Sequence, residues 1–292
     1  MELEKDIDRF IEALRKDGMA KNTAASYESD LRGLWAFCEE NRISGELTDT
    51  VLRSWLLRME FDGKSAATIA RAIASVRAYV RYQMAQGKLK SDPAKDLKSP
   101  GIRGKDIVIL SAKQIEILLE EPDGTTRKGR RDRAMLELAY SSGARVSELL
   151  ALSCGDVNTE YSYVTIRKEG GAAERVVPYG HAAAQALADY LMDRTPEETR
   201  PEALLFTNKA GGKMTRQGFY QLLKEYGERA GIDITGPQAL RDAYAGHMLR
   251  NGAGCADVAR LLGVSEGMVL KYLDHSGKAR ITEVYKNTHP RA

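Results

Sequence analysis

A break at residues 98–106, KSPGIRGKD, divides the chain into two stretches with different patterns. Proline, two glycines and four charged residues make this segment a predicted linker, because such residues favour loops over helices and strands. We expect a first domain at 1–98, a linker at 99–110 and a second domain at 111–292. At 292 residues the chain is long enough for two domains that each bury a core.

The first domain shows helical periodicity throughout. Apolar residues recur at spacings of three and four in four successive stretches, and the last of these stripes is Ile69, Ile73, Val76, Val80 and Met84. Short polar links separate the stretches. The pattern predicts a compact all-helical bundle.

The second domain adds one sign of β-structure to further helical stretches. The runs YVTIR and RVVPY are joined by KEGGAAE, whose glycines suit a hairpin loop. We therefore predict a chain that is mainly α with a small antiparallel β-sheet. An all-α N-terminal bundle is followed by a mixed α/β C-terminal domain.

Charge is distributed unevenly along a chain whose net charge is only +3. Between residues 64 and 105, ten lysines and arginines face two aspartates and no glutamate. Such a stripe is typical of a nucleic-acid-binding surface, although a solvated helix face gives the same pattern. The candidates for DNA contact are Lys64, Arg71, Arg77 and Arg81.

The three cysteines, Cys38, Cys154 and Cys255, are scattered and odd in number, which argues against a disulfide framework and favours the cytoplasm. No cysteine or histidine pair has zinc-ligand spacing, so we expect no metal and no cofactor. We also expect no membrane association, because no apolar run is long enough to cross a bilayer.

Three segments carry a resemblance to a known family. They are GARVSEL at 143–149, GPQALRDAYAGHMLRNGA at 236–253, and a tail that opens with LLG at 261–263 and closes with HPRA. With them the chain resembles tyrosine site-specific recombinases of the phage integrase family, Xer type, over nearly its whole length. The resemblance implies a core-binding domain, a catalytic-fold domain and an exchange helix at 276–292. It also implies double-stranded DNA as partner, and self-association or pairing with a related recombinase through that helix.

The resemblance assigns catalytic roles to three basic residues. Arg145 and Arg241 match the two arginines that hold the scissile phosphate, a task suited to a planar guanidinium that can reach two oxygens. Lys168 is the only lysine in the hairpin, where the family places the acid for the leaving 5′ oxygen. The loop spacing differs by two residues, so either Lys168 is that lysine or Gly170 has replaced it.

Four positions depart from the family pattern. Gln238 and Asp242 stand where the family has histidines, and Val264 stands where it has a hydrogen-bond donor to the phosphate. Losing one such donor typically costs roughly 10²–10³ in rate. An ungapped register places Leu273 at the nucleophile, with Tyr272 one residue earlier, roughly 100° around a helix.

Three functions remain open, and so does the question of whether the chain is an enzyme. The first is a DNA-binding family member that is impaired or inactive in cleavage, because leucine has no group that attacks phosphorus. The second is an active recombinase in which Tyr272 forms a 3′-phosphotyrosyl link, with Arg145, Arg241 and Lys168 assisting. The third is a protein-interaction scaffold on the same fold.

Overall fold

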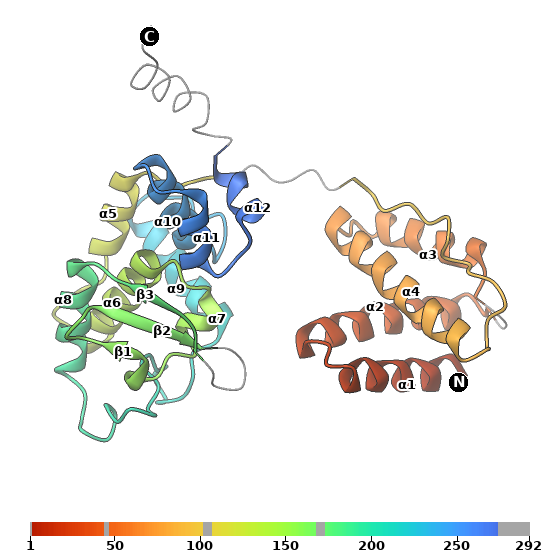
Figure 1. Cartoon of the computed structure of the whole chain (residues 1–292), viewed down its shortest axis with the longest axis horizontal. Coiled ribbons are helices and arrows are strands. Elements are labelled where there is room, and N and C mark those ends of the chain that lie inside the picture. Colours follow the sequence, from red (N-terminus) through yellow and green to blue (C-terminus); the bar gives the residue numbers. More distant parts are fainter. Residues whose placement is uncertain (1, 44–46, 102–106, 168–172, 274–292) are drawn as a thin grey trace, which may run out of the picture. The chain divides into compact units, whose positions relative to one another are not determined.

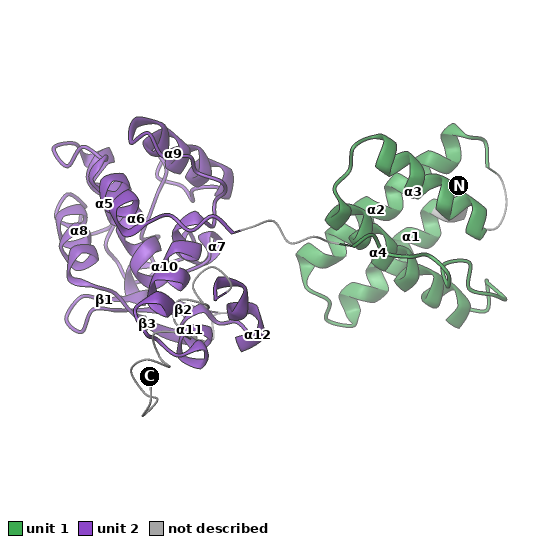
Figure 2. Ribbon diagram, turned by 90° about the horizontal axis from the view of Figure 1, so that it is seen from above, with its two compact units in different colours: residues 1–105 green, residues 106–292 purple. Residues whose placement is uncertain are grey.

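The computed structural model describes residues 2–43, 47–101, 107–167 and 173–273. The chain divides into two compact units, residues 1–105 and 106–292 (Figure 2). Within the described ranges, no helix has both the length and the apolar character needed to cross a membrane. Each unit has its own hydrophobic core.

The first unit is the predicted helical bundle. Its helices are α1 (Glu2–Lys16), α2 (Lys21–Glu40), α3 (Asp49–Phe61) and α4 (Ala66–Ala85) (Figure 1). Thr48 and Ser65 cap α3 and α4, because each side chain accepts a hydrogen bond from a backbone N–H three residues on. The core includes Leu31, Leu34, Leu52 and Ile73, all at most 2% exposed.

The second unit combines helices with one small sheet (Figure 1). Its α-helices are α5 (Ala112–Glu120), α6 (Arg127–Ser142), α7 (Val146–Leu149), α8 (His181–Leu191), α9 (Arg216–Arg229), α10 (Ala239–Arg250), α11 (Cys255–Leu262) and α12 (Glu266–Val269). Two short 3₁₀ helices are η1 (Cys154–Asp156) and η2 (Leu270–Tyr272).

The predicted hairpin is confirmed and lies within a three-stranded antiparallel sheet. The strands β1 (Val157–Asn158), β2 (Tyr163–Arg167) and β3 (Ala173–Pro178) follow in that order across the sheet. Val164 pairs with Val177, and both are fully buried because alternate residues face the helices. The predicted fold class, mainly α with a small antiparallel sheet, is thus correct.

A glycine ends α6 and directs the chain into the candidate site. Gly143 has a φ of 57°, a left-handed conformation that favours glycine. A Cβ atom here would also lie 2.5 Å from the Tyr244 ring of α10. The turn at Gly143 therefore needs both the conformational freedom and the small size of glycine, and it brings Arg145 to the start of α7.

The residues just before α5 belong to the core of the second unit. Leu110 is 3% exposed, and Ile109 lies against Gly246 of α10. His247 Nε2 donates to the Leu110 carbonyl at 2.8 Å, and the Tyr140 hydroxyl lies 2.9 Å from His247 Nδ1. Ile107, Ile109 and Leu110, in the stretch that the sequence assigned to the linker, thus pack on the core of the second unit.

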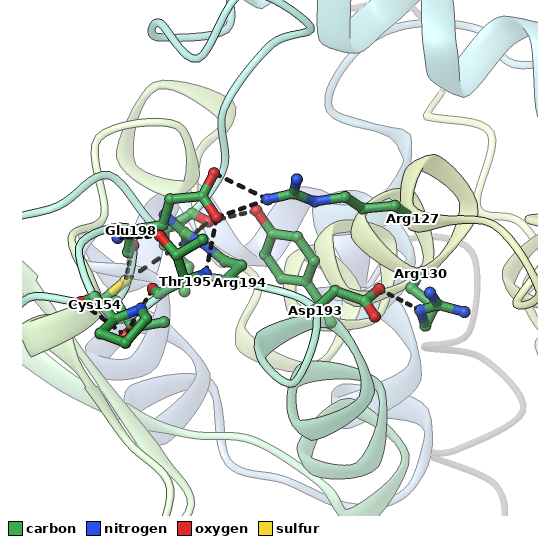
Figure 3. Close-up of polar contacts among 11 residues, drawn as sticks. Arg127, Arg130, Cys154, Asp193, Arg194, Thr195 and Glu198 are labelled. Carbon is green, nitrogen blue, oxygen red and sulfur yellow. Dashed lines mark hydrogen bonds and ion pairs between the residues drawn. The ribbon is translucent and has the colours of Figure 1, made fainter.

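A polar cluster fastens the turn after α8 (Figure 3). Glu198 accepts from Arg127 of α6 at 2.6 and 2.8 Å and from the Thr195 backbone N–H at 3.0 Å. Arg194 donates to Cys154 Sγ at 3.6 Å. Burial raises the pKa of the Cys154 thiol, although Arg194 opposes this, so the sulfur is not an activated nucleophile.

Candidate active site

Arg145 occupies the N-cap position of α7 and is held by Glu148 one turn later. Its Nη1 donates to Glu148 Oε1 at 2.6 Å, and its backbone N–H donates to Oε2 at 2.7 Å. Its Nη2 donates to the Gly263 carbonyl at 2.9 Å. The side chain is nevertheless 37% exposed, so the guanidinium is fixed on one side and open to a ligand on the other.

Arg241 lies in the first turn of α10 and is 8% exposed. Its guanidinium donates to the Gly143 carbonyl at 2.5 Å and to the Leu262 carbonyl at 2.8 Å. Burial, and then the nearby Arg145, lower the pKa of Arg241 to about 10. Arg241 therefore stays charged at neutral pH, and the structure brings both predicted arginines to one place.

A third arginine, Arg175 of β3, was not assigned to the site from the sequence. Its guanidinium donates to both oxygens of Glu148, at 2.7 and 3.2 Å, and its Nε donates to the Leu261 carbonyl at 2.8 Å. Its side chain is only 7% exposed. The only sign in the sequence that Arg175 belongs to the site was its position just after the hairpin loop. The sequence does not indicate which helix an arginine on a strand will contact.

Glu148 is the central anion of this arginine centre, defined as Arg145, Arg175, Arg241 and Glu148. Burial by itself would raise the pKa of Glu148, but the hydrogen bonds from Arg175 and Arg145 lower it below its ordinary value. Glu148 is therefore ionised at neutral pH. Three guanidinium groups around one carboxylate leave positive charge in excess, which is the electrostatic requirement for an anion site.

The three guanidinium groups also cap the C-terminal end of α11. They donate to three consecutive carbonyls: Arg175 to Leu261, Arg241 to Leu262 and Arg145 to Gly263. The last carbonyls of a helix have no partners within the helix, and that end carries negative partial charge. The arginine centre thus satisfies the end of α11 while it assembles a cluster of positive charge.

Tyr272 lies in η2 and points into the protein. Its hydroxyl donates to Asp242 Oδ1 at 2.6 Å, and the residue is 4% exposed. Its ring packs in a cluster with Tyr244, Val258 and Val269. Burial, followed by the hydrogen bond to Asp242, raises the pKa of Tyr272 well above its ordinary value. The phenol therefore holds its proton firmly.

Three of the other altered positions are Val264, Leu273 and Gln238, and of these only Gln238 carries a hydrogen-bonding side chain. Val264 and Leu273 are partly buried and pack against the same cluster as Tyr272. Gln238 is the exposed N-cap residue of α10, and its side chain makes no capping hydrogen bond. Lys168 and the predicted exchange helix at 276–292 lie outside the described residues.

The four basic candidates of the first unit have different surroundings. Lys64 and Arg71 line one groove between α2, α3 and α4, and Arg71 makes a two-point contact with Asp30 at 2.8 and 2.9 Å. Arg77 instead donates to the Leu97 carbonyl at 2.6 Å. Arg81 is exposed. The structure therefore brings together Lys64 and Arg71, whereas Arg77 holds the segment that follows α4.

Known proteins share both parts of this architecture. Residues 109–279 match the phage integrase family, and residues 7–87 match the phage integrase N-terminal SAM-like domain. Tyrosine recombinase XerD of Listeria innocua is 36% identical over 297 residues, covering 98% of this chain and 99% of the relative. XerD of Staphylococcus haemolyticus is 31% identical over 296 residues, covering 99% and 100%.

Solved structures share the fold at lower identity. The Tn1549 transposon integrase, in complex with transposon right end DNA, gives a TM-score of 0.73 at 19% identity, covering 96% of this chain and 99% of that one. XerH site-specific recombinase bound to difH substrate gives 0.69 at 19%, covering 92% and 80%. The family matches and the XerD relatives show that the chain belongs to the phage integrase family of tyrosine recombinases and is Xer-like.

Proposed function

We propose that this protein binds double-stranded DNA through phosphate contacts and is impaired in cleaving it. The observation that carries the proposal is the contrast between Arg145, which is fixed yet open, and Tyr272, whose hydroxyl is buried on Asp242. The first supports phosphate binding. The second supports loss of cleavage.

The excess positive charge of the arginine centre supports binding. Guanidinium groups recognise phosphate by paired, charge-assisted hydrogen bonds, and Arg145 has the exposure to make them. Lys64 supplies a further exposed cation in the first unit, in a groove where Arg71 is paired with Asp30. The Tn1549 integrase in complex with transposon right end DNA and XerH bound to difH substrate share this fold and support DNA as the ligand.

The surroundings of Tyr272 and Leu273 support impaired cleavage. A phenol with a raised pKa is a poor source of phenolate, and leucine offers no nucleophilic atom. Val264 cannot donate a hydrogen bond to a phosphate oxygen. Cleavage would therefore require Tyr272 to leave its packed position and to lose its proton.

A second candidate function is active cleavage by Tyr272. The favourable observation is the same 2.6 Å hydrogen bond, because the Asp242 carboxylate is placed to accept the phenol proton. The Arg241 charge also acts to lower the pKa of Tyr272. The phenolate oxygen would bond to phosphorus, and the 5′ oxygen would leave and take a proton from an acid such as Lys168.

A trapping experiment distinguishes these functions. The probe is a randomised library of duplexes with a nick beside each candidate phosphate, which lets the cleaved fragment diffuse away and keeps any covalent adduct. We expect no adduct from the unaltered chain. An adduct that Tyr272→Phe abolishes would establish the second function instead. Leu273→Tyr is the matched gain-of-function variant, because it restores a hydroxyl at the in-register position.

Binding is tested separately by titrating a 30-bp duplex at several salt concentrations. We expect the logarithm of the association constant to fall linearly with the logarithm of salt, with roughly one unit of slope per phosphate contact. Absent or salt-insensitive binding would contradict the proposal and favour an interaction scaffold. Sedimentation with and without the duplex tests the self-association through residues 276–292 that the family resemblance implies.

A further inference from the structure

We propose that Arg175 is a positioning residue of the phosphate site, acting through Glu148 on Arg145. The inference rests on the proposed DNA binding. Arg175 does not contact the ligand in this proposal. It keeps Arg145, which does contact the ligand, in place.

The exposures separate the two roles. The Arg175 side chain is 7% exposed and the Arg145 side chain is 37% exposed. A ligand in solution can therefore reach Arg145, whereas Arg175 is covered. Both Arg175 terminal nitrogens already donate to Glu148, and its Nε donates to the Leu261 carbonyl. Its hydrogen-bonding groups are directed at protein atoms.

Glu148 transmits the effect. It receives the Arg145 side chain on Oε1 and the Arg145 backbone N–H on Oε2, while Arg175 donates to the same two oxygens. The carboxylate is 12% exposed, so water cannot fully replace a lost partner. Without Arg175, Glu148 would be free to turn toward the remaining cations, and the Arg145 fork would lose its fixed orientation.

Arg175 also links Glu148 to the end of α11. The Leu261 carbonyl that it caps lies two residues before Gly263, whose carbonyl fixes the second terminal nitrogen of Arg145. One side of the Arg145 guanidinium is thus held by Glu148, which Arg175 contacts. The other side is held by the Gly263 carbonyl, two residues after the carbonyl that Arg175 caps. A lysine could not replace it fully, because an ammonium lacks the planar fork that spans a carboxylate and a carbonyl.

The test compares Arg175→Gln, Arg145→Gln and the double variant on a 30-bp duplex over a range of salt. If Arg175 acts through Arg145, each single variant lowers affinity by on the order of tenfold and makes the salt slope shallower by about one. The double variant then adds little, because the two residues serve one contact. Arg167→Gln on neighbouring β2, 47% exposed, is the control and leaves the slope unchanged.

Arg175→Lys guards against loss of folding, since it keeps a cation at the buried position. We expect it to remain folded by circular dichroism and to show an intermediate salt slope. Folded Arg175 variants with the unaltered slope and affinity would overturn the positioning role, even if they melt earlier. So would additive losses in the double variant. An unaltered chain that binds no duplex would overturn the proposed function, and this inference with it.

Discussion

The arginine centre and the C-terminal end of the site, residues 264–273, are held in place by different interactions. The arginine centre is held by main-chain carbonyls and one carboxylate, and it retains excess positive charge. The C-terminal end is held by apolar packing and by the Tyr272–Asp242 hydrogen bond, in which the polar groups satisfy each other. The arginine centre keeps one guanidinium, that of Arg145, exposed to solvent. At the C-terminal end, the Tyr272 hydroxyl is already paired with Asp242.

The difference separates the residues proposed to hold a phosphate from those that a cleavage step would need. Arg145 and Arg241 cap α11 as well as presenting charge, so the fold has its own need for them. Val264 and Leu273 instead contribute apolar packing against the cluster that contains Tyr272.

Arg241→Ala is expected to have the largest effect on stability. Two buried carbonyls, of Gly143 and Leu262, would lose their donor, which should lower the free energy of unfolding by roughly 2–5 kcal/mol. Urea unfolding measures this. Arg250→Ala at the exposed end of α10 is the control and should change stability by less than about 0.5 kcal/mol. Equal effects would mean that the fold does not need the arginine centre.

Breaking the Tyr272–Asp242 hydrogen bond should have the next largest effect. Tyr272→Phe should lower the free energy of unfolding by roughly 1–3 kcal/mol, because a buried bond to a charged group is lost. Asp242→Asn and the double variant complete a cycle whose coupling energy isolates the pair. A coupling near zero would show that packing alone orders this end.

Acid should affect the arginine centre through Glu148, by a smaller amount. The pKa of Glu148 is lower in the folded chain than its usual value of about 4.3, so its contribution to stability is present above that pH. The contribution is lost as pH falls through the folded-state pKa. Urea midpoints between pH 6 and pH 3 should therefore fall less steeply in Glu148→Gln. Parallel curves for the two proteins would argue against a paired Glu148.

Lys64→Ala should have the smallest effect on stability and still weaken DNA binding. The residue is exposed and lines the groove that Arg71 shares, so its loss should change unfolding by less than about 0.5 kcal/mol. The salt slope should become shallower by about one if Lys64 contacts a phosphate. An unchanged slope would mean that Lys64 contacts no phosphate. The proposed DNA surface would then lose this residue of the first unit.

The sequence predicted the features that depend on local order. Helical periodicity, the hairpin and the match around Arg145 and Arg241 all follow from neighbouring residues. Arg175 was missed because its role depends on where β3 meets α7 and α11, far away along the chain. The pairing of Tyr272 with Asp242 was missed for the same reason, since thirty residues separate them. The one-residue offset predicted that Tyr272 is out of register with the family tyrosine. It did not predict that the Tyr272 hydroxyl would bond to Asp242.

The hydrogen bond between His247 and the Leu110 carbonyl limits where a fragment containing only the second unit can begin. A fragment beginning at residue 111 would lose the acceptor of the buried imidazole N–H and also Ile109, which fills the space beside Gly246. A fragment beginning at residue 107 would keep both. The segment before α5 is thus the first piece of that unit's core, and a boundary drawn from composition alone would remove it.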